Sequence, residues 1–156
     1  IVDEKGLRES LVNGKEKKFI SDFPTPGMLG LENVILMPHL GASTSEAEEN
    51  CAFMVASQIT EFLQNGNIKN SVNFPEVNLE RTLGSFRLAV VNRNVPKILG
   101  SVLSALADKN INVLDMLNKS KDEIAYNLID IDTKVSDQLL AEISRIEGVV
   151  NTRGFH

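Results

Sequence analysis

The sequence predicts two parts of different fold class, an open α/β segment over residues 1–85 and an α+β sandwich over residues 86–156. The first observation behind this prediction is that the order of strand-like and helix-like segments differs between the two parts. Another is charge, because residues 1–85 carry seven basic and twelve acidic side chains and residues 86–156 carry nine of each. A proline-containing turn at 73–78 and a hinge-like Gly84 separate the two parts, and we place the domain boundary there.

The composition excludes several classes of protein. The 156 residues are 42% hydrophobic and 24% charged, with a net charge of -5 that disfavours nucleic-acid binding. A single Cys51 cannot form an internal disulfide, which predicts a reducing, cytoplasmic location, and no Cys/His cluster offers a zinc or other metal site. No apolar run approaches the ~20 residues of a membrane span. The chain opens at Ile1 without an initiator methionine, so we expect it to be part of a longer protein.

The second part has the pattern of a split βαβ sandwich. One helix is expected to begin near Asn94 and Pro96, with Asn94 as its cap, and another to begin at Ser136 and end by Gly148. The expected strands cover 86–91, 111–117, 124–131 and 149–155, with a hairpin at 121–123. The order βαββαβ predicts a ferredoxin-like α+β fold with both helices on one face of an antiparallel sheet.

The first part has the pattern of the end of an open α/β sheet. A short helix is expected over 3–12, brief strands over 18–21 and 34–37, and a long helix that stops at Asn65-Gly66. Ser43 with Glu46, or Ser45 with Glu48, has the capping-box spacing for the start of that helix.

One histidine stands where open α/β sheets place their ligands. His39 follows an apolar strand and precedes Gly41 and a capped helix, so it lies on a loop at the carboxyl end of a strand. The alternative is a loop histidine that only makes local hydrogen bonds. Dinucleotide G-x-G-x-x-G, P-loop, H-E-x-x-H and G-x-S-x-G patterns do not occur.

Residues 34–44, with Glu46, Ala47, Glu48 and Asn50 after them, resemble the catalytic-histidine segment of the D-3-phosphoglycerate dehydrogenases, which are D-isomer-specific 2-hydroxyacid dehydrogenases. Residues 68–77 are similar to that family's crossover, and residues 86–156 resemble its ACT domain, an amino-acid sensor. The resemblance implies a carboxyl-terminal fragment, in which a Rossmann-type remnant over 1–85 precedes an ACT regulatory domain.

The resemblance implies an enzyme for the parent protein. There His39 would be the general base in the NAD-dependent oxidation of 3-phosphoglycerate to 3-phosphohydroxypyruvate, the first step of serine biosynthesis. Pro26 stands at the position of the glutamate that orients this histidine in the family. The NAD-binding loop and the substrate arginine would precede Ile1, so we expect this chain alone neither to bind NAD nor to catalyse the reaction.

The resemblance also implies an effector site. The family's loop reads His-x-Asn-x-Pro-Gly, and here Asn94-Val95-Pro96 matches, Asn92 replaces the histidine and Lys97 replaces the glycine. Asn112 matches a further asparagine. Asn92, Asn94 and Asn112 would therefore bind L-serine or another small amino acid, since amides both accept from an ammonium and donate to a carboxylate. The alternative is that Asn94 only caps a helix and Asn112 only shapes a turn.

Two functions follow from these observations. In the first, the chain belongs to a phosphoglycerate dehydrogenase whose ACT domains pair edge to edge in a homo-oligomer and bind the effector at their junction. In the second, it is a stand-alone ACT module that binds another amino acid or serves only for oligomerisation.

Overall fold

The computed structural model describes residues 2–15 and 18–155, and the chain divides into two compact units, Ile1–Ala52 and Phe53–His156. The division falls inside the long helix α2 (Ser45–Asn65). Each unit is therefore described on its own, and the predicted domain boundary after residue 85 stays a prediction.

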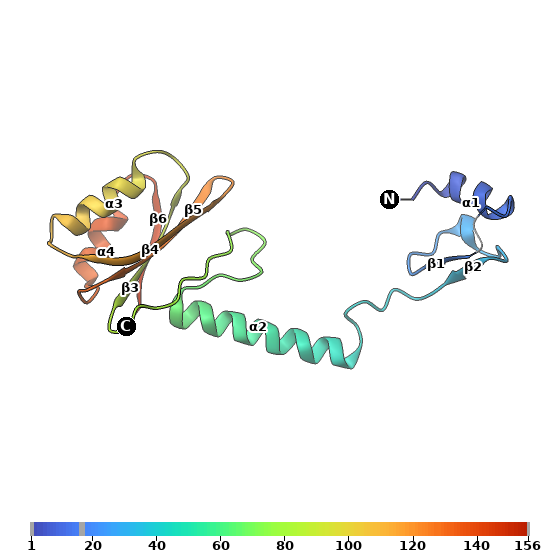
Figure 1. Ribbon diagram of the computed structural model, residues 1–156, viewed down its shortest axis with the longest axis horizontal. Helices are drawn as coiled ribbons and strands as arrows, with labels where there is room; N and C mark the ends of the chain where they lie inside the picture. Colours follow the sequence, from blue (N-terminus) through green and yellow to red (C-terminus); the bar gives the residue numbers. More distant parts are fainter. Residues whose placement is uncertain (1, 16–17, 156) are drawn as a thin grey trace. The chain divides into compact units, whose positions relative to one another are not determined.

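The first unit holds a short parallel pair of strands, as Figure 1 shows. Helix α1 (Glu4–Val12) begins at Asp3, whose Oδ2 accepts a hydrogen bond from the Gly6 amide at 3.2 Å. Strand β1 (Phe19–Ser21) pairs in parallel with β2 (Val34–Leu36), and the single-turn helix η1 (Pro26–Met28) lies between them in sequence. The predicted helix and both strands are confirmed. A wider Rossmann-type sheet is not seen among the described residues, so that origin stays a proposal.

Helix α2 differs from the sequence expectation only in the residue that caps its start. Thr44 Oγ1 accepts the Ala47 amide hydrogen bond at 3.2 Å, so Thr44, and neither Ser43 nor Ser45, caps the helix. Gly66 ends the helix with a φ of 73°, as predicted from the Asn-Gly pair. None of the residues of α2 is buried.

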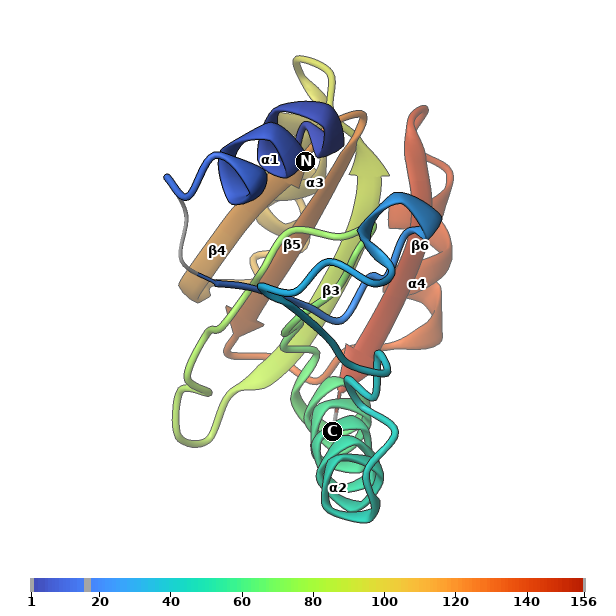
Figure 2. The same cartoon turned by 90° about the vertical axis from the view of Figure 1, so that its right-hand side faces the viewer.

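The second unit is built on a four-stranded antiparallel sheet in the order β4-β5-β3-β6, which Figure 2 shows side by side. The strands are β3 (Phe86–Arg93), β4 (Val113–Lys121), β5 (Ile124–Ile131) and β6 (Val149–Phe155). Helices α3 (Ile98–Ala107) and α4 (Asp137–Ser144) lie together on one face of this sheet (Figure 1). The predicted ferredoxin-like order βαββαβ is confirmed.

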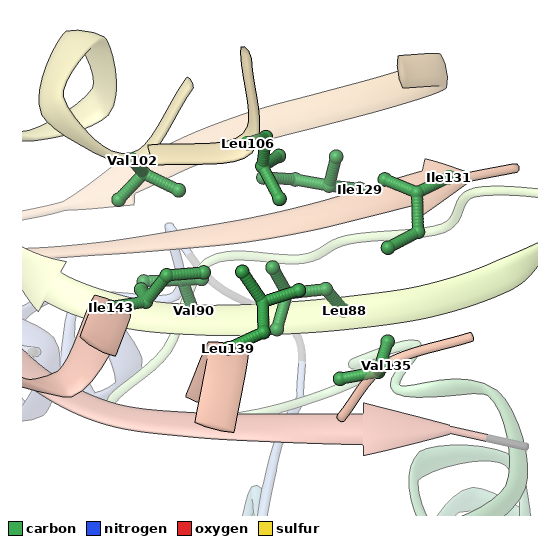
Figure 3. Packing of buried hydrophobic residues seen from close by; sticks show 9 residues of the cluster. All are labelled: Leu88, Val90, Val102, Leu106, Ile129, Ile131, Val135, Leu139 and Ile143. Atoms are coloured by element: carbon green, nitrogen blue, oxygen red, sulfur yellow. The ribbon is translucent and has the colours of Figure 1, made fainter. Parts of the chain in front are cut away.

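A hydrophobic core lies between the sheet and the two helices. Successive side chains of a strand face opposite sides of the sheet. Alternate residues of β3 and β5 therefore point toward the two helices. Figure 3 shows these side chains meeting those of the helices and of the loop before α4. The core residues are Leu88, Val90, Val102, Leu106, Ile129, Ile131, Val135, Leu139 and Ile143.

The opposite face of the sheet is covered by the segment 66–85. Ile68 and Val77 pair through a single antiparallel bridge and pack on the sheet residues Tyr126 and Leu128. Gly66 sits so close to the sheet that an added Cβ would lie 2.8 Å from the Leu128 side chain. The sequence predicts this segment as the end of the first part, 1–85, whereas in the structure it lies within the second unit and packs on its sheet.

A buried ion pair fixes the end of α2 and the segment 66–85 to the sheet. Arg87 and Asp130, both fully buried, pair through Nε–Oδ1 at 2.6 Å and Nη2–Oδ2 at 2.9 Å. Arg87 Nη1 also donates to the carbonyl oxygens of Asn65 and Leu79, both at 2.9 Å, and the Thr82 amide donates to Asp130. Burial opposes ionisation of Asp130, but the hydrogen bonds from Arg87 and Thr82 outweigh it and hold the pKa of this carboxyl below its usual range.

Three sequence expectations for the second unit need correction. Asn94 does not cap α3, because the helix begins after Lys97, whose side chain makes no capping hydrogen bond. The second helix ends at Ser144 rather than at Gly148, which has a φ of 91° and precedes β6. The strand expected over 111–117 runs from Val113 to Lys121, since it pairs with β5 as far as the hairpin turn.

Candidate functional site

The structure brings His39 and Asp22 together at one edge of the first unit. Asp22 follows β1 directly, and His39 lies in the loop after β2. Because β1 and β2 are parallel, their carboxyl ends meet at the same edge, which places the two side chains side by side. His39 Nδ1 lies 2.7 Å from Asp22 Oδ2, and both side chains are about half exposed, at 54% and 43%.

This arrangement leaves the second nitrogen of His39 available for proton transfer. A carboxylate on Nδ1 favours a proton on that nitrogen, so that Nε2 carries the free lone pair that a base needs. The Phe23 ring lies against the imidazole, with 4.4 Å between ring centroids and an angle of 40° between the ring planes. His39 therefore has a carboxylate partner, although Pro26 occupies the glutamate position of the family pattern.

The residues present do not form a dinucleotide site. A pyrophosphate is held by amides of a glycine-rich turn between a strand and a helix. In the first unit the loop between β2 and α2 carries only Gly41, and it also carries His39. This loop therefore lacks the glycine-rich turn that holds a dinucleotide, and the expectation that this chain alone does not bind NAD stays a prediction.

Asn94 lies beside the hairpin that joins β4 and β5. Its amide nitrogen donates to the Glu123 carbonyl at 2.8 Å, and its Nδ2 donates to the Asp122 carbonyl at 3.1 Å. Within the part of the chain that the structure describes, Asn94 Oδ1 accepts no hydrogen bond. Asn94 borders a hollow of about 660 Å³ together with Arg93, Asp122 and Glu123, so both charge signs are available there to a zwitterion.

Asn92 lies inside the sheet rather than on the loop surface, and is only 4% exposed. Its Oδ1 accepts from Asn127 Nδ2 at 2.6 Å and its Nδ2 donates to the Arg93 carbonyl at 2.7 Å. Asn118 Nδ2 donates in turn to Asn127 Oδ1, so three amides from β3, β5 and β4 form a chain. Because both groups of the Asn92 amide already have protein partners, its direct contact with an effector stays a prediction.

Asn112 lies at the opposite end of β4 from Asn94. It precedes Val113, and its backbone is paired with Asp132 through two hydrogen bonds of 3.2 Å, one from its amide to Oδ1 and one to its carbonyl. Its side chain is exposed and makes no hydrogen bond to residues 2–15 or 18–155. Since β4 has nine residues, its ends are about 27 Å apart. One chain alone therefore does not bring Asn94 and Asn112 to one small ligand.

Lys97 has a backbone conformation that favours glycine. Its φ of 78° and ψ of -25° put it in the left-handed region immediately before α3. This conformation costs a residue with a Cβ about 1 to 2 kcal/mol. The glycine of the family loop is thus explained by the backbone, and this chain keeps a charged side chain there at a cost in stability.

Sequence reasoning missed Asp22. The available signal was that an acidic residue follows the first strand as the histidine follows the second. That signal could be used only with the knowledge that the two strands are parallel neighbours, which no local sequence pattern predicts.

In the residues that the structure covers, no group of His, Cys, Asp and Glu could hold a metal ion. No helix of the described chain has the length and apolar character needed to cross a membrane.

A protein-family model and several sequence relatives match this chain. A family model described as the ACT domain matches residues 86–148. D-3-phosphoglycerate dehydrogenase of Haemophilus influenzae is 34% identical over 164 residues, which cover 98% of this chain and 40% of the relative. The enzyme of the same name from Escherichia coli is 33% identical over 135 residues, covering 85% of this chain and 33% of the relative. The chain thus spans less than half the length of these relatives.

One of the solved structures that are similar to this chain is also an ACT domain. The ACT domain from GTP pyrophosphokinase of Chlorobium tepidum is similar with a TM-score of 0.40 and 15% identity, over 46% of this chain and 96% of that domain. Together, the matched family model and the sequence relatives show that this chain contains an ACT domain and matches the carboxyl-terminal, ACT-containing part of the D-3-phosphoglycerate dehydrogenases.

Proposed function

We propose that this chain is the carboxyl-terminal portion of a cytoplasmic, NAD-dependent 3-phosphoglycerate dehydrogenase that acts in serine biosynthesis. In this proposal the first unit is a remnant of a Rossmann-type catalytic domain. The second unit senses a small amino acid, L-serine in the first instance. Support comes from the relatives, which match 98% and 85% of this chain, and from the pairing of His39 with a carboxylate.

His39 would act as the general base of the reaction. Asp22 holds Nδ1, and Nε2 would take the proton of the substrate C2 hydroxyl as that carbon is oxidised to a ketone. NAD, the hydride acceptor of such an enzyme, would be held by residues outside this chain. The chain on its own is therefore expected to be inactive toward 3-phosphoglycerate.

The effector site would form only between two copies of the ACT domain. Strand β4 is an edge strand, and among the described residues only β5 pairs with it. If two β4 strands pair antiparallel about a two-fold axis, the start of each lies beside the end of the other. Asn112 of one protomer would then lie near Asn94 of its partner.

The observation that carries this proposal is the separation of Asn94 and Asn112 along β4. Two asparagines at opposite ends of a strand about 27 Å long have no shared small ligand unless a second copy supplies one of them. A zwitterion at the junction would have the Asn94 and Asn112 amides, together with Arg93, for its carboxylate and the Asp122 and Glu123 carboxylates for its ammonium.

Calorimetric titration with L-serine, combined with light scattering, tests this proposal. We expect a dimer or larger assembly that binds L-serine, and an affinity about tenfold to a hundredfold weaker after Asn112→Ala, because a charged ligand group loses a hydrogen bond. Asn33→Ala, an exposed substitution in the first unit, is the matched control and should bind as the unaltered chain does. A monomer, or an affinity that Asn112→Ala leaves unchanged, would contradict the proposal.

The alternative is an ACT module that binds another amino acid or only assembles. The replacement of the family's histidine by Asn92 and of its glycine by Lys97 favours a changed ligand. A dimer that binds a different amino acid in the same titration panel, with the same loss on Asn112→Ala, would select this alternative.

A further inference from the structure

Two asparagine–glycine pairs stand at the ends of helices in this chain. Asn13-Gly14 follows α1, and Asn65-Gly66 ends α2. Both glycines have a positive φ, 67° and 73°. An asparagine side chain reacts most readily with the backbone when glycine follows it, because glycine has no Cβ to obstruct the approach. The same reactive dipeptide thus occurs in two places, and the surroundings decide which of the two can react.

The first pair is open to solvent. Asn13 and Gly14 are both exposed, and the Asn13 side chain makes no hydrogen bond to residues 2–15 or 18–155. A Cβ added to Gly14 would find no heavy atom within 4 Å. The Gly14 amide donates to the Leu11 carbonyl at 3.2 Å. Among the described residues, this one hydrogen bond restrains the two groups that would react.

The second pair is held at several points. Asn65 Nδ2 donates to both carboxylate oxygens of Glu61 at 3.1 Å, and the Asn65 carbonyl accepts from Arg87 at 2.9 Å. Gly66 is buried, and its amide donates to a carbonyl of the preceding helical turn at 3.0 Å. Its own carbonyl accepts from the Tyr126 hydroxyl at 2.8 Å. Rotation of either residue would therefore break several hydrogen bonds at once.

We propose that Asn13 is a site of spontaneous deamidation in the folded chain, and that the fold protects Asn65 from the same reaction. The deprotonated Gly14 backbone nitrogen attacks Cγ of Asn13, the bond from Cγ to Nδ2 breaks, and Nδ2 takes up a proton and leaves as ammonia. Water then opens the resulting cyclic imide at either of its carbonyl groups. The product is aspartate or isoaspartate, and the net reaction consumes one water and releases one ammonia.

This modification would change the end of α1. The new carboxylate lies where the last carbonyl groups of the helix give a partial negative charge, so its own charge is unfavourable there. The last turn of α1 carries no basic residue to offset it. Isoaspartate also adds a carbon atom to the backbone path. We therefore expect both products to weaken the end of α1.

Peptide mapping by mass spectrometry, after incubation at mildly alkaline pH, tests this proposal. One sample of the full chain is kept folded and another is kept in urea. In the folded chain Asn13 should deamidate at least about tenfold faster than Asn65, because reaction at Asn65 requires the end of α2 to open locally. In urea the two rates should become similar, since each asparagine then precedes a glycine in an open chain.

Substitutions one helical turn before each asparagine provide matched variants. Glu61→Ala removes the carboxylate that holds Asn65 Nδ2, and should speed deamidation of Asn65 about threefold without changing the rate at Asn13. Glu9, which is exposed, stands at the same spacing before Asn13, and Glu9→Ala should leave both rates unchanged. Asn13→Gln should remove the mass gain of its peptide, because the longer side chain closes the ring poorly.

Equal rates at Asn13 and Asn65 in the folded chain would overturn the proposal. An Asn13 that keeps its amide when folded, during the time in which it reacts in urea, would overturn it as well. An unchanged rate at Asn65 in Glu61→Ala would refute the protection assigned to that carboxylate. The reaction needs neither NAD nor an effector nor a second copy, so its outcome is independent of the proposed function.

Discussion

Arg87 is the most consequential single residue of the second unit, because its guanidinium is fully buried and holds four oxygen atoms on three segments. Asp130→Asn would leave this buried cation without its counter-charge. We predict a loss of about 3 to 5 kcal/mol in the free energy of unfolding, measured by urea denaturation near neutral pH.

The same pair predicts a dependence of stability on acid. The pKa of Asp130 is lower in the folded chain than in the unfolded chain, so its contribution is fully present above the unfolded pKa and is lost as pH falls through the folded pKa. The unfolding free energy of Asp130→Asn should therefore vary less with pH below about 4 than that of the unaltered chain. An equal pH dependence in both proteins would show that the pair does not set acid stability.

His39 and Asp22 give a prediction about catalysis. In a chimera that joins the preceding part of the Haemophilus influenzae relative to this chain, His39→Ala should lower kcat about a hundredfold to ten-thousandfold, because it removes the proposed base. Asp22→Asn should lower kcat by a smaller factor and leave KM for 3-phosphoglycerate nearly unchanged, since Asp22 only positions the imidazole. A chimera that is active without His39 would refute the assigned role.

At the residue scale, the sequence points to His39 as a candidate base but does not predict the carboxylate of Asp22 beside it. The histidine is visible because a strand, a proline and a glycine surround it in sequence. The partner lies 17 residues away on a loop whose position depends on strand pairing. Asn94 was expected to cap α3, but its side chain donates to the Asp122 carbonyl instead, a contact 28 residues away that no local rule reveals.

At the scale of elements, the strands and helices were predictable and the packing of the segment 66–85 was not. Apolar periodicity identifies each element of the sandwich, whereas glycine and proline positions misplace some helix ends, since α4 ends at Ser144 and not at Gly148. The segment 66–85 has no regular periodicity. Its contacts come from Ile68 and Val77, whose sheet partners Tyr126 and Leu128 lie much later in the sequence.

Gly66 tests how closely the end of α2 approaches the sheet. Gly66→Ala should destabilise the chain by more than Gly84→Ala, measured by chemical denaturation. Both glycines have a positive φ, 73° and 77°, but only at Gly66 would a Cβ meet side chains, those of Leu128 and Phe155 at 2.8 Å. Each change should cost about 1 kcal/mol from the backbone, and Gly66→Ala an additional 1 to 3 kcal/mol, roughly, from overpacking. Equal losses would mean that the segment is held less tightly than the structure shows.

At the scale of the whole molecule, the order of elements predicted the ferredoxin-like sandwich, whereas the domain boundary that the charge division placed after residue 85 stays a prediction. The sequence could not reveal which candidate effector residues meet. Asn94 and Asn112 match one motif, yet they lie at opposite ends of β4, and Asn92 lies inside the sheet. In the proposed effector site, two copies of the chain would bring Asn94 and Asn112 together, and no pattern within one sequence predicts how two copies pair.

The most direct test of a shared effector site mixes two variants, Asn94→Ala and Asn112→Ala. Each variant alone should bind L-serine weakly, because every site in its dimer lacks one amide. After the two are unfolded together and refolded, mixed dimers should carry one site with both asparagines, and calorimetry should recover unaltered affinity at about a quarter of all sites. No recovery of high-affinity sites in the mixture would contradict the claim that two protomers build the site.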